Sequence, residues 1–302
     1  MSVRHVHDPC MAKADGHYYV YSTGAGIPIR RSPDLIHWER IGRVFTEDVP
    51  AWAREVVPGS RGIWAPDIAF FRGRFHLYYA VSTFGSNRSV IGLATNTTLD
   101  PSCAEYDWVD EGEVLRSDHD DGYNAIDPNL VFVSHDQVAL AFGSFWSGIK
   151  MIRLDHRTGK PEPGAVLVSL ARHPPSTAIE APFLMRRGPY FYLFVSWDFC
   201  CRGAGSTYNI RVGRARQAAG PYRDREGKPM LDGGGTLVLG TEGDMIGPGG
   251  CSVYQGAADD LLVHHFYDGG QNGVPTLQIR PLIWTPDGWP VAGRPLAQAT
   301  GE

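Results

Sequence analysis

The sequence lacks an excess of basic residues and any long apolar run. With 28 Lys and Arg against 33 Asp and Glu, the formal net charge is −5, which excludes the strongly basic surface that nucleic-acid binding requires. No run of about 18 apolar residues is present, so we expect no membrane helix. No basic and apolar leader precedes position 8, which predicts a cytoplasmic protein, or a secreted one if an export signal was removed from this sequence. We therefore expect neither a nucleic acid nor a membrane as partner.

The cysteine pattern is equally sparse. The five cysteines are odd in number, irregularly spaced and without a CxxC pair; they are Cys10, Cys103, Cys200, Cys201 and Cys251. This pattern argues against a disulfide framework and against a zinc site. Because neighbouring cysteines close only a strained disulfide, we expect Cys200 and Cys201 to be reduced and buried, like most of the others.

Glycine and proline are abundant, whereas amphipathic stretches at helical spacing are hard to find. The chain holds 36 glycines and 22 prolines among 302 residues, which favours short strands joined by many turns. One pattern recurs along the chain: a short apolar strand, a turn, and a second strand rich in aromatic or aliphatic residues, as in a β-hairpin. The copies of this hairpin open at Asp8, Ala65, Asp127, Glu180 and Pro248.

The spacing of these hairpins indicates the fold class. Successive copies begin 57, 62, 53 and 68 residues apart, a period that suits four-stranded propeller blades. No change in composition interrupts the series. We therefore predict an all-β, five-bladed β-propeller that occupies residues 1–302 as a single domain, with the first strand of each blade lining a central channel.

Three of the residues that open the hairpins are acids. Asp8, Asp127 and Glu180 would converge on the channel axis, where each predicted inner strand begins. An acid at a strand start often only caps a turn, but three carboxylates around one axis repel each other and raise each other's pKa, which points to a function. One ionised carboxyl that activates water and one protonated carboxyl that assists a leaving group are the requirements of glycoside hydrolysis.

Aromatic side chains near the ends of predicted strands offer flat apolar faces for sugar rings. Trp64, Phe84, Trp146 and Trp197 lie at such positions. Each of them, taken singly, is more often a core residue than a sugar platform.

Several motifs resemble one known family. The motifs are HDP at 7–9, WAPDI at 64–68, YNAIDPN at 123–129, IEAPF at 179–183, WDFCCRGAGSTY at 197–208 and PTLQIRPLIW at 275–284. In this order they resemble the arabinanases of glycoside hydrolase family 43, and the last two resemble the endo-1,5-α-L-arabinanases in particular. The resemblance implies a five-bladed propeller that cleaves α-1,5-linked L-arabinan or arabino-oligosaccharides with inversion.

The resemblance also assigns roles to residues. Asp8 would be the general base and Glu180 the general acid, while Asp127 would hold Glu180 in place and raise its pKa. Inversion then requires the carboxyl groups of Asp8 and Glu180 to lie roughly 6.5–9.5 Å apart, with room for one water molecule. Further residues match positions at the substrate cleft: Trp64, Phe84, Asn124, Ser144, Trp146 and Arg202.

A metal ion on the propeller axis, usually calcium, is a further implication of the resemblance. The matching residue is His265 in LLVHHFYD, whereas His264 would face the other side of the same strand. A lone strand histidine is more often a core residue. Because a hard cation prefers oxygen ligands to imidazole, water would have to supply most of the coordination.

Other functions remain as alternatives. An exo-acting α-L-arabinofuranosidase or β-xylosidase on the same scaffold differs in the loops at the cleft rim. A propeller that only binds carbohydrate would not need three converging acids in these roles. We expect a monomer that acts on arabinan or its oligosaccharides.

Overall fold

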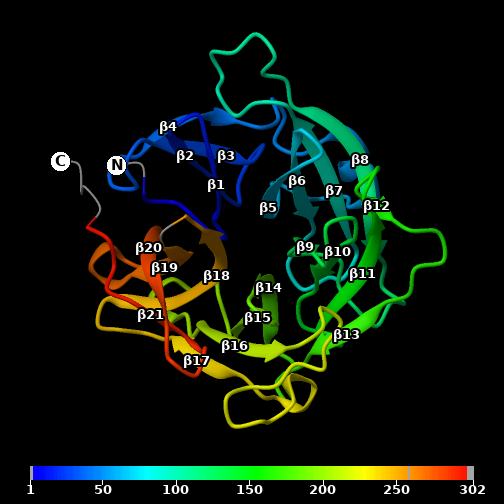
Figure 1. The fold of residues 1–302 in the computed structure, drawn as a ribbon. Coiled ribbons are helices and arrows are strands. Elements are labelled where there is room, and N and C mark those ends of the chain that lie inside the picture. The colour runs from blue at the N-terminus through cyan, green and yellow to red at the C-terminus, as the bar shows by residue number, and fades with distance from the viewer. Residues whose placement is uncertain (1–2, 258, 298–302) are drawn as a thin grey trace.

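Five antiparallel sheets surround a central channel in the computed structural model, which describes residues 3–257 and 259–297 (Figure 1). The first blade contains β1 (Cys10–Ala14), β2 (His17–Tyr21), β3 (Pro28–Ser32) and β4 (Glu39–Arg43). The second contains β5 (Trp64–Phe71), β6 (Arg74–Val81), β7 (Ser89–Asn96) and β8 (Val109–Ser117). The third contains β9 (Asn129–Phe132), β10 (Val138–Phe142), β11 (Ile149–Asp155) and β12 (Lys160–Pro161), with β13 (Val168–Ala171) also paired to β11.

The remaining two blades repeat the arrangement. The fourth contains β14 (Ile179–Arg187), β15 (Tyr190–Trp197), β16 (Asn209–Ala215) and β17 (Thr236–Leu239). The fifth contains β18 (Met245–Gln255), β19 (Asp260–Asp268), β20 (Val274–Trp284) and β21 (Pro290–Ala292). The predicted all-β, five-bladed propeller is confirmed. In every blade the first strand lies nearest the axis, as expected (Figure 1).

Helical structure is confined to short segments. The α-helix α1 (Ala51–Val56) was not predicted; it has a single buried residue, Ala53, which packs in the core between the first two blades. Short 3₁₀ helices lie at Gly203–Gly205, Met230–Asp232 and Gly269–Gln271. Within residues 3–257 and 259–297, no helix has the length and apolar character needed to cross a bilayer.

The hydrophobic core is divided among the interfaces between neighbouring blades. Side chains alternate between the two faces of a strand, so Tyr79 of β6 packs toward the first blade while the adjacent Tyr78 packs toward the third. Leu140 and Ala141 of β10 divide in the same way between the second and fourth blades. Each fully buried large apolar side chain contributes about 1.5–3 kcal/mol, so the sheets are held together face to face.

The ring closes where the N-terminal segment meets the fifth blade. The Val6 N–H donates to the Pro275 carbonyl at 3.1 Å, and the Leu277 N–H donates to the Val3 carbonyl at 2.8 Å. Val3 and Val6 also share an apolar cluster with Leu277 of β20. Residues 3–6 therefore continue the edge of blade five and deliver the chain to the axis at Asp8.

One backbone feature recurs at the inner strand of every blade: a residue in the left-handed conformation, which precedes β1 and β9 and lies within β5, β14 and β18. The φ angles are +49° at Asp8, +39° at Ala65, +56° at Asp127, +51° at Ala181 and +54° at Gly250. The sequence-based alignment of the repeats was therefore wrong by one residue for Glu180 and by two for Pro248. The sequence comparison aligned the repeats by their apolar runs. In blades four and five the apolar run begins at a different distance from the left-handed residue than in the other blades, so the alignment was shifted there.

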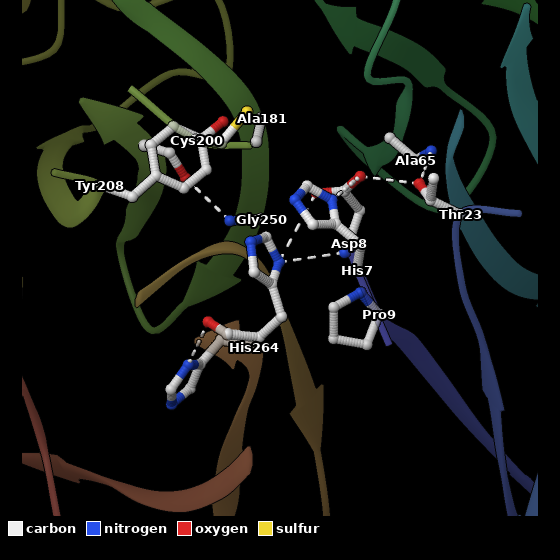
Figure 2. Close-up of polar contacts among 12 residues, drawn as sticks. His7, Asp8, Pro9, Thr23, Ala65, Ala181, Cys200, Tyr208, Gly250 and His264 are labelled. Atoms are coloured by element: carbon white, nitrogen blue, oxygen red, sulfur yellow. Dashed lines mark hydrogen bonds and ion pairs between the residues drawn. The ribbon is translucent and has the colours of Figure 1, made fainter. Parts of the chain in front are cut away.

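Side chains from neighbouring elements satisfy the amide groups at these positions. The donors and acceptors are Asp8 N–H to His265 Nδ1 (3.1 Å), Ala65 N–H to Thr23 Oγ1 (2.8 Å), Ala181 N–H to Asp127 Oδ2 (2.9 Å) and Gly250 N–H to Ser196 Oγ (3.0 Å). Buried amides left without a partner cost free energy. These bonds therefore fix the inner strands relative to one another at the mouth of the channel (Figure 2).

Candidate active site

A cavity of about 980 Å³ opens at the end of the channel where the inner strands begin. The three acids and all six residues expected at the cleft line it: Asp8, Asp127, Glu180, Trp64, Phe84, Asn124, Ser144, Trp146 and Arg202. They come from the first four blades, or from loops that follow their strands, and only the propeller closure brings them together. The predicted His265 does not line this cavity.

Asp8 is held as a carboxylate by two neighbours. Its Oδ2 accepts from Thr23 Oγ1 at 2.7 Å and pairs with His7 Nδ1 at 2.7 Å (Figure 2). Burial acts to raise the pKa of Asp8, but the charge and the hydrogen bond of His7 outweigh it and lower the pKa to about 2. Burial likewise acts to lower the pKa of His7, and the Asp8 carboxylate raises it to about 10. Asp8 is therefore ionised at neutral pH, with the properties of a base.

His7 links this carboxylate to the rest of the site. Its Nε2 is 2.7 Å from the Tyr267 hydroxyl, which in turn accepts the Cys201 N–H at 2.7 Å. Sequence reasoning assigned no function to Tyr267 or Thr23. A signal for Tyr267 was present, because it lies two residues after His265 and therefore on the same face of β19.

Glu180 has the opposite electrostatic character. Its Oε2 accepts from Ser144 Oγ at 2.6 Å, and its Oε1 accepts from the Tyr208 hydroxyl. Burial raises the pKa of Glu180, and the negative charge of Asp8 acts in the same direction, while the two hydrogen bonds oppose the shift. A carboxyl with a raised pKa retains its proton, as a general acid must.

Asp127 supports the backbone beside Glu180. Its Oδ2 accepts the Ala181 N–H at 2.9 Å, so it fixes the residue that follows Glu180, whereas Ser144 and Tyr208 hold the Glu180 carboxyl itself. Burial raises the pKa of Asp127 well above its usual value, and the charges of Glu180 and Asp8 add to this. Tyr208 lies in the STY segment of the resemblance, but sequence reasoning assigned it no contact.

The cavity walls combine exposed aromatic rings with polar groups. Phe84 is 79% exposed and packs at 5.0 Å between ring centroids against Trp64, while Trp146 is 38% exposed. Arg202 stacks over the Phe199 ring at 4.1 Å. Such faces suit the apolar sides of sugar rings. Asn124 is buried and accepts from Ser89 Oγ at 2.7 Å.

Trp197 differs from these aromatic residues. It is buried in the core between the third and fourth blades and stacks on His173 at 3.8 Å. Its position near a strand end therefore has a packing role, because the ring faces the blade interface.

His265 meets the axis from the fifth blade. Its ring is fully buried, its Nδ1 accepts the Asp8 N–H, and Asp8 Oδ1 lies 3.7 Å from Nδ1. Its Nε2 is buried without a hydrogen-bond partner among the described residues. Because Nδ1 accepts a hydrogen bond, the neutral ring carries its proton on Nε2, which is therefore a donor and needs an oxygen acceptor. A water molecule of a hydrated cation fits this need.

The chain was compared with known families. The model of glycosyl hydrolases family 43 matches residues 3–290. The chain belongs to this family. A protein of Bacillus subtilis named extracellular endo-α-(1→5)-L-arabinanase 1 is 43% identical over 289 residues, which cover 94% of this chain and 87% of that protein. A Cellvibrio japonicus protein named extracellular exo-α-(1→5)-L-arabinofuranosidase ArbA is 41% identical over 297 residues, covering 94% and 85%.

A solved structure agrees with the family 43 assignment. The structure of Cellvibrio cellulosa α-L-arabinanase complexed with arabinohexaose superimposes with a TM-score of 0.92 at 39% identity and covers 97% of this chain and 96% of that chain. One expectation is overturned. The two sequence relatives are named extracellular proteins, which points to secretion, so the expected cytoplasmic location is wrong.

Removal of the Tyr208 hydroxyl tests the hydrogen bonds of Glu180. In Tyr208→Phe the bond that favours the charged carboxylate is lost, so the pKa of Glu180 rises further. Activity is lost as pH rises through this pKa, and the alkaline limb of the kcat/KM profile therefore moves to higher pH. We expect kcat to fall by about tenfold, because the carboxyl also loses orientation. An alkaline limb that stays in place or moves to lower pH would contradict this account of Glu180.

Gly250→Ala tests the crowding at the axis. A Cβ at this position would meet Asp8 Oδ1 at 2.3 Å and the His265 ring at 2.9 Å, so we expect displacement of Asp8 and a loss of kcat of at least about tenfold. Gly243→Ala is the matched control, because Gly243 has φ +57° and an added Cβ meets nothing within 4 Å. Both variants should lose about 1 kcal/mol of stability from the left-handed backbone, measured by thermal unfolding. Equal kcat values in the two variants would refute the crowding.

Proposed function

We propose that the protein is an endo-acting arabinanase that hydrolyses α-1,5-linked L-arabinan or its oligosaccharides with inversion. The observation that carries this proposal is the electrostatic contrast of two carboxyls in one cavity. Asp8 is kept ionised by His7, and burial favours the protonated form of Glu180. A base and an acid that face the same cavity meet the requirements of glycosidic bond hydrolysis.

The chemistry follows from the placement of the oxygen atoms. Oδ2 of Asp8 is engaged by Thr23 and His7, and within residues 3–257 and 259–297 no hydrogen bond is donated to Oδ1. Oδ1 therefore takes a proton from water, the water oxygen attacks the anomeric carbon, and Glu180 gives its proton to the departing oxygen. Asp127 holds the backbone of the acid in place. Inversion by this route requires carboxyl groups roughly 6.5–9.5 Å apart.

The walls of the cavity support a substrate of several sugar units. Aromatic rings lie on blades two and three, and Arg202 lies in the connection between β15 and β16 of blade four, so the lining extends well beyond the three acids. The solved relative is complexed with arabinohexaose, and the B. subtilis relative is named an endo-arabinanase. The exo-acting alternative has its own support, because the C. japonicus relative is named an exo-enzyme. We propose that the protein works as a monomer.

Product analysis on linear arabinan separates these possibilities. The endo proposal predicts early oligosaccharides of mixed length and a rapid loss of viscosity, whereas release of monosaccharide alone from chain ends would favour the exo-enzyme. The anomeric configuration of the first product, followed by NMR, should be β from an α-linkage. An initial α-anomer would rule out inversion.

The acid and the base are distinguished by their variants. Glu180→Gln and Asp8→Asn should each lower kcat on arabinan by roughly 10²- to 10⁴-fold. An aryl arabinoside with a good leaving group needs no protonation, so it should restore turnover by Glu180→Gln and leave Asp8→Asn inactive. Glu162→Gln, at an exposed glutamate after β12, is the matched control and should keep full activity. Equal rescue of both variants would contradict the assigned roles.

We further propose that a hydrated cation, with calcium the preferred candidate, binds at Nε2 of His265. A bound cation supplies positive charge near Asp8, and water provides most of its oxygen ligands. The buried Nε2 without a partner supports this site.

Thermal unfolding after removal of divalent cations tests the calcium site. Added calcium should raise the unfolding midpoint, because a ligand at a hundredfold excess over Kd stabilises the folded state by about 2.7 kcal/mol. His265→Gln should weaken this response. His264→Gln should keep it, since His264 is buried on the other face of β19. A wild-type unfolding midpoint that does not change when calcium is added would exclude the site.

A further inference from the structure

The turn that follows β15 presents two neighbouring cysteines to the substrate cavity. Cys200 and Cys201 both line this cavity, and their Sγ atoms lie 2.7 Å apart. Cys10 and Cys251 are buried as expected, but Cys201 is exposed and Cys200 is partly exposed. The expectation of a buried vicinal pair is therefore wrong, because the turn lies at the cavity rim and not between blades.

The distances distinguish two chemistries for this pair. His7 Nε2 lies 3.7 Å from Cys201 Sγ, and the three ligand atoms lie within 4.8 Å of one another, as a soft-metal site would require. Two thiolates on one tetrahedral zinc ion, however, are held about 3.8 Å apart. The observed 2.7 Å is nearer to the sulfur separation of a disulfide, about 2.05 Å. The geometry therefore favours oxidation of the pair over chelation.

The backbone of the turn has an unusual conformation at Cys201. Neighbouring Cα atoms are about 3.8 Å apart, which is shorter than the 4.4–6.8 Å of ordinary disulfides, so a vicinal disulfide is strained and readily reduced. Cys201 has a φ of +63°, which departs from the usual backbone of a non-glycine residue. Its N–H is anchored to the Tyr267 hydroxyl at 2.7 Å.

The two sulfurs differ in reactivity. The hydrogen bond from Cys200, together with the hydrogen bond and charge of His7, lowers the pKa of Cys201 to about 5 although burial opposes the shift. The same pairing raises the pKa of Cys200. Cys201 thus provides an exposed thiolate, which is the nucleophile in thiol–disulfide exchange, and Cys200 provides the second thiol.

We propose that Cys200 and Cys201 form a reversible vicinal disulfide in the wall of the substrate cavity. The Cys201 thiolate attacks a low-molecular-weight disulfide such as oxidised glutathione, forms a mixed disulfide and releases one thiolate. Cys200 then loses its proton and attacks Cys201 Sγ, which expels the second thiolate. The protein loses two electrons and the Cys200 proton, and the small disulfide is reduced to one thiol and one thiolate. The extracellular relatives agree with an oxidising environment.

The disulfide should also affect substrate binding in the cleft. This part of the inference rests on the proposed function. The turn carries Arg202 to the cavity and is tied through Tyr267 to His7. The disulfide restricts the conformations of this turn. Substrate binding to the oxidised protein therefore costs less conformational entropy than binding to the reduced protein. Reduction should therefore raise KM for arabinan by roughly two- to tenfold.

Peptide mapping tests the bond itself. Protein treated with oxidised glutathione is alkylated directly or after reduction. The peptide with Cys200 and Cys201 should escape alkylation in the first sample and be two hydrogen masses lighter, and both thiols should be alkylated in the second. Cys103, an exposed cysteine, reports that the alkylation is complete after reduction. Alkylation of both Cys200 and Cys201 without reduction would overturn the proposal.

Kinetics test the effect on the cleft. Wild-type KM should rise on reduction and return on reoxidation, as should that of Cys103→Ser. A variant with Cys200→Ser and Cys201→Ser should keep the higher KM under both conditions. A KM unchanged by reduction, or a response that persists in the double variant, would refute the effect on the cleft. If neither redox form hydrolyses arabinan, the proposed function fails, while the mass shift still decides the disulfide.

Discussion

The site depends on one constraint, the left-handed backbone conformation that recurs just before or within every inner strand. For a residue other than glycine this conformation costs roughly 1–2 kcal/mol, and it occurs at Asp8 and Asp127 but also at Ala65 and Ala181. Because the two alanines carry no catalytic group, the turn belongs to the blade architecture. The amides of Asp8, Ala65 and Ala181 donate hydrogen bonds to side chains of a neighbouring blade. Each bond is worth about 1 kcal/mol, which offsets much of the cost. The acids occupy positions that the fold itself immobilises.

The contacts that close the ring also position Asp8, the proposed base. Residues 3–6 pair with β20 of the fifth blade, and the chain reaches Asp8 directly afterwards. The Asp8 amide then bonds to His265, and His7 bonds to Tyr267, both on β19. Among its described residues, the fifth blade contributes no acid to the cavity, yet it fixes the residue that is proposed as the base. Loss of closure would therefore displace Asp8 before it unfolded the other blades.

Within one cluster of carboxyls, local partners decide which group holds a proton. Asp8 is balanced by the positive charge of His7, whereas Glu180 has only the neutral hydroxyl groups of Ser144 and Tyr208. Burial penalises charge at both positions, but only Asp8 has a cation to offset it. The difference between the proposed base and the proposed acid therefore comes chiefly from one histidine. The same histidine contacts Cys201, so the cavity rim and the base share one network.

The sequence by itself determined the repeat, the propeller and the three acids at the axis, because alternating apolar strands and an acid before a strand are local patterns. The resemblance to family 43 added six residues that line the cavity. It placed Glu180 and Pro248 in the wrong register, since the left-handed turn leaves no mark in the apolar pattern. It missed Thr23 and Tyr267 as partners of the His7–Asp8 pair and the exposure of Cys201. Only the tertiary structure decided these features. Thr23 meets Asp8 through the folding of the first blade, and Tyr267 meets His7 only because closure of the ring brings the fifth blade to the first.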